Sequence, residues 1–177
     1  MADMTEDEIK RALAGEAGEG EYELCSALMQ VGKRRLLEFR SDVDRHLTSS
    51  NPAVRGAAIQ AAAFHWRLPE YREVAQRMAE AEEDALTRSY AVTAWSSYHA
   101  ASKDKDVMGR LRDLLYDRQL PWEVRDAAYR GLMVVGGLDR RRFPLKRPFP
   151  DFDRKVDWSL IERLLAEVGL LVDNGSS

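Results

Sequence analysis

A short pattern that occurs three times constrains the fold of this chain more than any other feature. It opens a helical stretch over residues 51–66 and returns, with changes, over 84–95 and 122–132. In each copy small residues, mainly alanine, recur at helical spacing, so that another backbone can approach closely. Superposing the copies aligns three arginines at spacings of 33 and 37 residues, namely Arg55, Arg88 and Arg125. A repeat of this length predicts an all-α chain built from helix pairs.

Apolar periodicity predicts further helices around these copies, and no segment alternates like a sheet strand over a convincing length. Helices are expected over residues 22–31, 34–47, 71–81, 107–116 and 158–171. Asn51, Asp84 and Asp157 are expected to cap the helices that follow them, because their side chains can accept from a free backbone N–H. Gly32 is expected to end the helix over 22–31.

The predicted organisation is a single domain, a right-handed α-solenoid of about four helix pairs over residues 1–172. The repeat copies centre on 33–66, 70–100 and 104–137, followed by a Pro/Arg-rich loop over 138–156 and a C-terminal capping helix over 157–172. Three prolines exclude a long helix from the loop. Residues 173–177 are expected to form a disordered tail.

Charge and cysteine content exclude several classes of function. The net charge is −3, so the whole molecule is not a general binder of polyanions. Residues 1–90 have 12 basic and 17 acidic side chains, net −5, whereas residues 91–177 have 15 and 13, net +2. Cys25 is the only cysteine, which excludes an internal disulfide and a thiolate metal cage, and it is expected in the core. Without a signal-peptide pattern or a long apolar run, we expect a cytoplasmic protein with no membrane contact.

Two copies of the pattern resemble HEAT repeats, in particular the short bacterial kind. They read Val54-Arg55-x-Ala57-Ala58-x-x-Ala61 and Val124-Arg125-x-Ala127-Ala128-x-x-Gly131-Leu132. The resemblance covers roughly residues 21–137. It implies that the second helix of each pair lines a concave side and that the three arginines form a ladder between repeats.

The middle copy departs from the HEAT-like pattern, because Thr87 replaces the valine and Tyr90 replaces the first alanine. HEAT-like repeats occur in scaffolds, in toxin-neutralising immunity proteins, in bilin lyases and in DNA alkylation-repair glycosylases. The resemblance therefore implies a fold and does not choose among these functions.

The positions opposite the alanines on the second helices are expected to line the concave side and to form a candidate partner-binding face of mixed polarity. Its residues are Gln60, Thr93, Ser96, Asp126, Tyr129 and Arg130. Tyr129 and Arg130 are of the types that often dominate binding energy at protein interfaces. A nucleic-acid backbone would favour repeated lysine and arginine instead. We therefore predict a non-enzymatic protein-binding module, with an immunity protein or an assembly adaptor as its concrete forms.

Aromatic residues and histidines gather near corresponding ends of two repeat helices. They are His65, Trp66, Trp95, Tyr98 and His99. One interpretation is an aromatic pocket that stacks a flat ligand. The alternative is that these rings fill the core beside the many alanines, since large residues opposite small ones pack well.

A basic cluster in the loop supports a competing function. It comprises Arg140, Arg141, Arg142, Lys146 and Arg147, interleaved with Phe143, Phe149 and Phe152. Such a segment could bind phosphates and stack bases, which favours a nucleic-acid-binding protein related to the glycosylases. The alternative is that the phenylalanines anchor the loop while the basic side chains stay solvated.

The sequence lacks the common catalytic, phosphate-binding and metal-binding motifs. No Gly-rich phosphate loop, serine nucleophile motif or metal-ligand spacing is present, so no catalytic residue, metal or cofactor is predicted. The oligomeric state is left open. The three arginines are expected to bond carbonyls or carboxylates of the next turn, with Asp84 and Asp117 as candidate partners, rather than to stay solvated.

Overall fold

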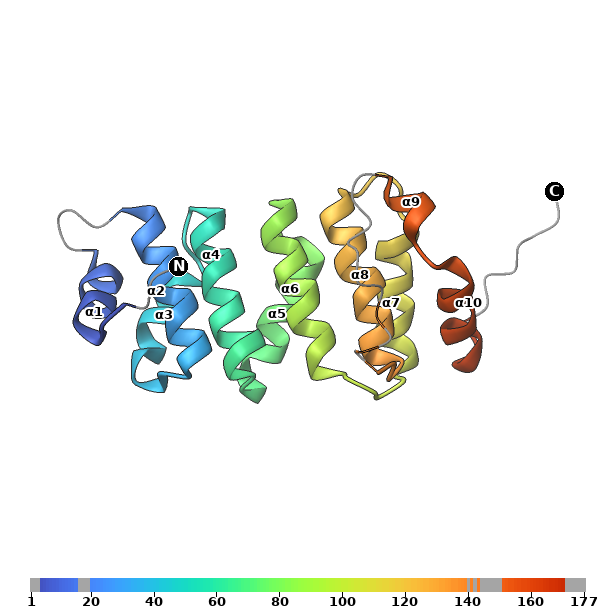
Figure 1. The fold of residues 1–177 in the computed structure, drawn as a ribbon, viewed down its shortest axis with the longest axis horizontal. Helices are drawn as coiled ribbons and strands as arrows, with labels where there is room; N and C mark the ends of the chain where they lie inside the picture. The colour runs from blue at the N-terminus through green and yellow to red at the C-terminus, as the bar shows by residue number, and fades with distance from the viewer. Residues whose placement is uncertain (1–3, 16–19, 140, 142, 144–150, 171–177) are drawn as a thin grey trace. The chain divides into compact units, whose positions relative to one another are not determined.

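The computed structural model describes residues 4–15, 20–139, 141, 143 and 151–170 (Figure 1). Every regular element within these residues is helical, which confirms the all-α class. The chain separates into two compact units, Met1–Trp95 and Ser96–Ser177, and the boundary falls within helix α6 (Ala85–Tyr98). Because two compact units can belong to one domain, the single domain over residues 1–172 stays a prediction.

The first unit consists of the helices up to the first part of α6. They are α1 (Glu6–Ala14), α2 (Glu21–Arg34), η1 (Leu37–Phe39), α3 (Arg40–His46), α4 (Pro52–Ile59), η2 (Gln60–Trp66), η3 (Pro69–Tyr71) and α5 (Arg72–Ala81). Helix α2 packs against α1, α4 and η2, and α3 packs against α4 and η2. The predicted caps are confirmed here: the Asn51 side chain accepts from the Ala53 N–H at 2.9 Å, and Asp84 accepts from Thr87 at 2.8 Å.

Gly32 does not end α2, so that prediction is wrong. The helix continues to Arg34 and ends where Arg35 takes a left-handed conformation with φ 56°. Gly32 is buried, and a Cβ atom there would lie 2.6 Å from the Cα atom of Ala61. Glycine is needed at this position because the two backbones approach so closely, not because the chain turns.

The helix predicted over residues 51–66 changes type half-way. Its second part, η2, is a π-helix that follows α4 without a break. Its buried residues include three alanines and Trp66, whose indole N–H donates to the Val31 carbonyl at 3.3 Å. The Arg35 guanidinium donates to the carbonyls of His65 and Trp66, both at 3.2 Å, so a cation satisfies the helix end.

The second unit contains α7 (Lys105–Tyr116), α8 (Trp122–Val135), α9 (Phe152–Lys155) and α10 (Trp158–Glu167). Helix α8 packs against both α7 and α10 around a core that includes Leu111, Leu132 and Ile161. Asp157 caps α10 as predicted, accepting from the Leu160 N–H at 3.0 Å. The loop predicted over 138–156 contains the short helix α9, and the predicted tail over 173–177 lies outside the described residues.

Candidate partner-binding groove

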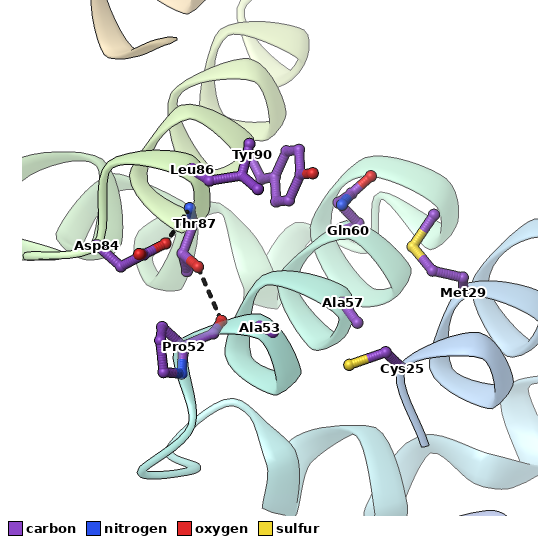
Figure 2. Close-up of a pocket in the computed structure, with 10 residues that line it drawn as sticks. All are labelled: Cys25, Met29, Pro52, Ala53, Ala57, Gln60, Asp84, Leu86, Thr87 and Tyr90. Carbon is purple, nitrogen blue, oxygen red and sulfur yellow. Dashed lines mark hydrogen bonds between the residues drawn. The ribbon is translucent and has the colours of Figure 1, made fainter. Parts of the chain in front are cut away.

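An open groove of about 410 Å³ crosses helices α2, α4 and α6 in the first unit (Figure 2). We call it the α2–α4–α6 groove. Its lining residues are Cys25 and Met29 of α2, Pro52, Ala53, Ala57 and Gln60 from α4 and the start of η2, and Asp84, Leu86, Thr87 and Tyr90 at the start of α6.

The groove is shaped by a difference in side-chain size. Helix α4 forms the floor with alanines, which add only a Cβ atom to the backbone. Figure 2 shows Met29 on one side of α4 and Leu86 and Tyr90 on the other, with the Tyr90 ring projecting toward Gln60. Tyr90 takes the place of the first alanine of the repeat pattern, so the departure of the middle copy from that pattern builds one wall.

Polar contacts between α4 and α6 fix the position of this wall. The Thr87 hydroxyl donates to the Pro52 carbonyl at 2.8 Å, a bond drawn in Figure 2. A Cβ atom at Gly56 would lie 3.1 Å from the Thr87 hydroxyl oxygen and 3.2 Å from a ring carbon of Tyr90. The glycine therefore lets the wall approach the floor, and Thr87 holds it there.

Large apolar side chains beside the groove are exposed to solvent. Leu86 is 52% exposed, and Tyr22, on α2, is 71% exposed. Tyr22 precedes Cys25 by three residues and Met29 by seven, so all three lie on the same face of α2. Cys25 is half-buried in the groove wall, and the expectation that it lies in the core is wrong.

The charges at the groove are acidic. Among the described residues that line the groove, Asp84 is the only charged one. The backbone N–H of Thr87 donates a hydrogen bond to the Asp84 carboxylate and thereby lowers its pKa. Glu21 lies one helical turn before Cys25. Partial burial raises the pKa of the Cys25 thiol, and the negative charge of Glu21 raises it further. A cation brought to this groove would therefore meet the carboxylate of Asp84, with that of Glu21 one helical turn before Cys25.

The three repeat arginines bind carbonyl groups near the C-terminal end of the helix before their own. Nε of Arg88 donates to Ala79 O at 2.8 Å, and Nε of Arg125 donates to Leu115 O at 2.9 Å. Arg55 donates to Ser49 O at 2.8 Å, in the turn after α3. Each guanidinium therefore ties the first turn of one helix to the end of its predecessor.

Two of these arginines also form forks with distant carboxylates. Arg55 donates to Glu82 through Nε at 2.9 Å and Nη2 at 2.6 Å, and Arg125 donates to Asp153 through both Nη atoms. Among the described contacts, neither predicted partner, Asp84 or Asp117, forms a hydrogen bond or ion pair with a repeat arginine, although the charge of Asp84, after the hydrogen bond and charge of Glu82, raises the pKa of Arg55. Asp84 caps α6, and Asp117 accepts from the backbone N–H of Gln119 at 2.9 Å.

The structure separates the predicted partner-binding residues into two sets. Gln60 lines the groove, and Thr93 is exposed three residues beyond Tyr90 on α6. Ser96, Asp126 and Tyr129 are at most 5% exposed, so their predicted exposure is wrong.

The burial of the second set has a structural cause. Tyr129 lies under the start of α10, and its hydroxyl oxygen accepts from the Asp157 N–H at 3.3 Å. Arg130 is half-buried and donates to Asp126 at 3.1 Å. These contacts stabilise the second unit and leave little of this set for a partner.

The predicted aromatic pocket is not assembled as an open site. Trp66 and Trp95 are at most 2% exposed, which agrees with the core-filling interpretation for these two rings. His65 is half-buried, and burial, helped by the charge of Lys33, lowers its pKa. Tyr98 and His99 belong to the second unit and are half-buried there.

The predicted nucleic-acid contacts lie mostly outside the described residues. This applies to Arg140, Arg142, Lys146 and Arg147. Arg141 is described, and its guanidinium pairs with the Asp139 carboxylate at 2.7 Å. Phe152 is buried, and the Arg125 guanidinium lies over its ring at 4.7 Å. Phe152 thus anchors the end of the loop.

The second unit has smaller cavities. One of about 250 Å³ is lined by Tyr116, Arg118, Arg125, Trp158 and Glu162. The rings of Tyr116 and Trp158 meet edge to face at 5.3 Å, and Arg125 is occupied by Asp153. Another, of about 150 Å³, has a mainly apolar lining that includes Val134 and Leu138. Neither matches the size of the α2–α4–α6 groove.

Sequence reasoning missed most of the groove. It selected Gln60 but not Cys25, Met29, Leu86 or Tyr90. Two signals were available: the middle copy departs from the pattern at Thr87 and Tyr90, and α2 has an apolar face with Tyr22 that its own core does not use.

Comparison with known proteins adds no relative, since no family model, curated protein or solved structure matches this chain. Within the described ranges, no three histidine, cysteine, aspartate or glutamate side chains gather where they could hold a metal ion. The helices of the described residues are also too short or too polar to cross a membrane.

Proposed function

We propose that this chain is a non-enzymatic protein-binding module and that the α2–α4–α6 groove is its contact surface. In this proposal the helix pairs stack as HEAT-like repeats of an α-solenoid, and α2, α4 and α6 are the second helices of their pairs. An immunity protein that covers a toxin, or an assembly adaptor, is the concrete form. The supporting observation is an open apolar groove lined by the exposed side chain of Leu86, with the exposed Tyr22 on the same face of α2 as two other lining residues.

Two physical arguments favour a protein as the ligand. Exposed apolar side chains clustered at a groove typically mark an interaction site, since water contact with them is unfavourable. Pockets for small molecules enclose most of their ligand, whereas this groove is open and has an exposed floor residue, Ala53. A long partner segment can use such a surface through several side chains at once.

Nucleic-acid binding is supported less well by the described residues. Arg141 is already paired with Asp139, and the charges at the groove are acidic and would repel phosphate. This alternative therefore depends on the basic residues that lie outside the described ranges.

Site-specific photo-cross-linking tests the proposal. A benzoyl-phenylalanine replaces Leu86 in one variant and Leu37, which is 44% exposed outside the groove, in the other. Both variants are expressed in the source cells, irradiated, and their adducts identified by mass spectrometry. We expect one defined protein adduct from position 86 and none from position 37. Equal labelling from both positions, or nucleic acid as the main adduct of position 86, would contradict the proposal.

A further inference from the structure

We propose that the occupant of the α2–α4–α6 groove is a basic amphipathic helix of a partner protein, an inference that rests on the proposed function. Its apolar stripe would lie on the alanine floor, and its lysine or arginine side chains would lie beside Asp84 and Glu21. The proposal thus specifies the chemistry of the partner: apolar anchors flanked by positive charge.

The charge argument begins with the two carboxylates. Asp84 lines the groove, and Glu21 lies close enough to Cys25 to raise the pKa of its thiol. Neither carboxylate has a described ion pair with a basic side chain of the first unit. Neither carboxylate is therefore held in a described ion pair of the first unit, so a cation from outside can approach both.

The arginines of the neighbouring helices form their hydrogen bonds with other groups, although the charge of Arg55, after the Thr87 N–H and hydroxyl, also lowers the pKa of Asp84. Arg55 is held by Glu82 at 2.6 Å and by the carbonyl of Ser49. Arg88 donates to the carbonyls of Ala79 and Glu80. The first unit as a whole has 12 basic and 17 acidic side chains, since residues 91–95 are uncharged. Its net charge of −5 would also attract a basic partner at a distance.

The shape argument favours a helix. The groove volume of about 410 Å³ is enough for a few large apolar side chains, and its floor is bounded on both sides. Helices that bind in grooves insert apolar side chains spaced three, four and seven residues apart from one face. Met29 in one wall is an unbranched side chain that can adapt to different anchors, while Leu86 and Tyr90 form the opposite wall.

Three model peptides test the inference with the full chain. Each has 18 residues and a leucine stripe at helical spacing, and the remaining positions are lysine, glutamine or glutamate. Binding is measured by fluorescence anisotropy, and by calorimetry for the tightest peptide. We expect the lysine peptide to bind most tightly and the glutamate peptide most weakly, with the lysine preference falling as salt screens the carboxylates.

Two steric variants locate the binding site. Ala53→Trp places an indole at an exposed position on the groove floor and should lower the affinity for the lysine peptide at least tenfold. Ala81→Trp, at another exposed alanine at the end of α5, is the matched control and should leave the affinity unchanged. Leu86→Gln, at a half-exposed position, provides a second blocking variant if Ala53→Trp does not fold.

Charge variants test the role of the carboxylates. Glu21→Gln combined with Asp84→Asn keeps the shapes, and asparagine can still cap α6. Because exposed ion pairs contribute little each, we expect the lysine peptide to bind about three- to tenfold more weakly and the glutamine peptide to be unaffected. Glu73→Gln removes the corresponding first-turn carboxylate of α5, outside the groove, and should have no effect.

Each outcome decides the inference. Equal binding of the lysine and glutamine peptides would overturn the basic partner but leave the proposed function standing. Binding that Ala53→Trp does not weaken, or no binding of any peptide, would also overturn the inference, and cross-linking from position 86 would then decide the proposed function. A dimer in sedimentation equilibrium that Ala53→Trp dissociates would assign the groove to a second copy and overturn it as well.

Discussion

Each unit has a repeat arginine in the first turn of a helix, and in each this arginine pairs with a carboxylate. The two units differ in which partner of the ion pair is buried. In the first unit the Glu82 side chain is 6% exposed and that of Arg55 is 21% exposed. In the second unit Arg125 is the buried partner at 6%, and the Asp153 side chain is 48% exposed. Removing the arginine therefore leaves a buried carboxylate in one unit and a hydrated carboxylate in the other.

The units also differ in the row of residues beside this arginine. Where α6 has Leu86 and Tyr90 in the first unit, the aligned positions of α8 have Glu123 and Ala127 in the second. Leu86 and Tyr90 line the α2–α4–α6 groove, whereas Glu123 is half-buried and Ala127 is buried. The arginine that the copies share thus fixes how each helix begins, while the residues at these two positions differ between the copies, and in the first unit they line the groove.

Arg55→Met should have the largest effect on stability. It leaves Glu82 buried with only the Asp84 backbone N–H as a partner, at 3.1 Å. We expect a loss of about 3 kcal/mol in the free energy of unfolding at pH 7, near the lower end of the range for breaking a buried ion pair. Urea unfolding measures this loss, with Arg163→Met as the exposed control, for which less than about 0.5 kcal/mol is expected.

The Arg55→Met penalty should depend on pH. The hydrogen bond from Arg55 lowers the pKa of Glu82 in the folded state. A lowered carboxyl pKa stabilises the fold above the unfolded pKa of about 4.3 and stops doing so as pH falls through the folded pKa. The difference between wild type and Arg55→Met should therefore be constant from pH 8 to 6 and shrink in acid. A penalty that stays the same at pH 3 would contradict this account of Glu82.

Arg125→Met should cost less, about 2 kcal/mol, because Asp153 can return to water. The loss comes from the Leu115 carbonyl, which stays buried without its donor, and from the contact with the Phe152 ring. The hydrogen bond from Arg125 also lowers the pKa of Asp153, so this penalty too should shrink in acid, while the part from the Leu115 carbonyl and the Phe152 ring should remain when both variants are unfolded with urea across the same pH range. A larger loss than for Arg55→Met would reverse the comparison of the two ion pairs.

Gly32→Ala should have a smaller effect, and Gly131→Ala a smaller one still. The new Cβ atom at Gly32 would lie 2.6 Å from a backbone carbon of Ala61, whereas at Gly131 the nearest atoms belong to side chains, the Ser96 hydroxyl oxygen at 2.5 Å and a Leu111 methyl carbon at 3.1 Å, which can shift more easily than a backbone. We expect a loss of about 1–2 kcal/mol for Gly32→Ala after the helix preference of alanine is included. Thermal melts of the two variants compare them directly, and equal losses would mean that the α2–η2 contact can relax.

Sequence reasoning predicted the features that depend on neighbours in the chain. The all-α class follows from the repeat and from apolar periodicity along the chain, and the caps at Asn51, Asp84 and Asp157 follow from residues within one helical turn. It failed where a distant segment decides the outcome. The close approach of Ala61 keeps Gly32 inside a helix, and α10 covers Tyr129. The arginine partners also lie 27 and 28 residues away, beyond any local pattern.

Most of the candidate groove could not be predicted for a related reason. Its floor and its walls come from three helices, and only their packing brings Met29, Ala57 and Tyr90 together. The π-helix after Ile59 also changes the helical phase, so a regular helical projection does not identify the exposed residues beyond that point.

The most direct test of the central claim is an NMR titration of methyl-labelled methionines with the lysine peptide. Met29 lines the groove, Met78 is half-exposed on α5, and Met108 and Met133 are buried in the second unit. If the groove is the binding surface, the Met29 methyl signal should shift progressively to saturation while the signals of Met78, Met108 and Met133 stay in place. Saturable shifts of those three signals with Met29 unchanged would show that a partner helix binds elsewhere.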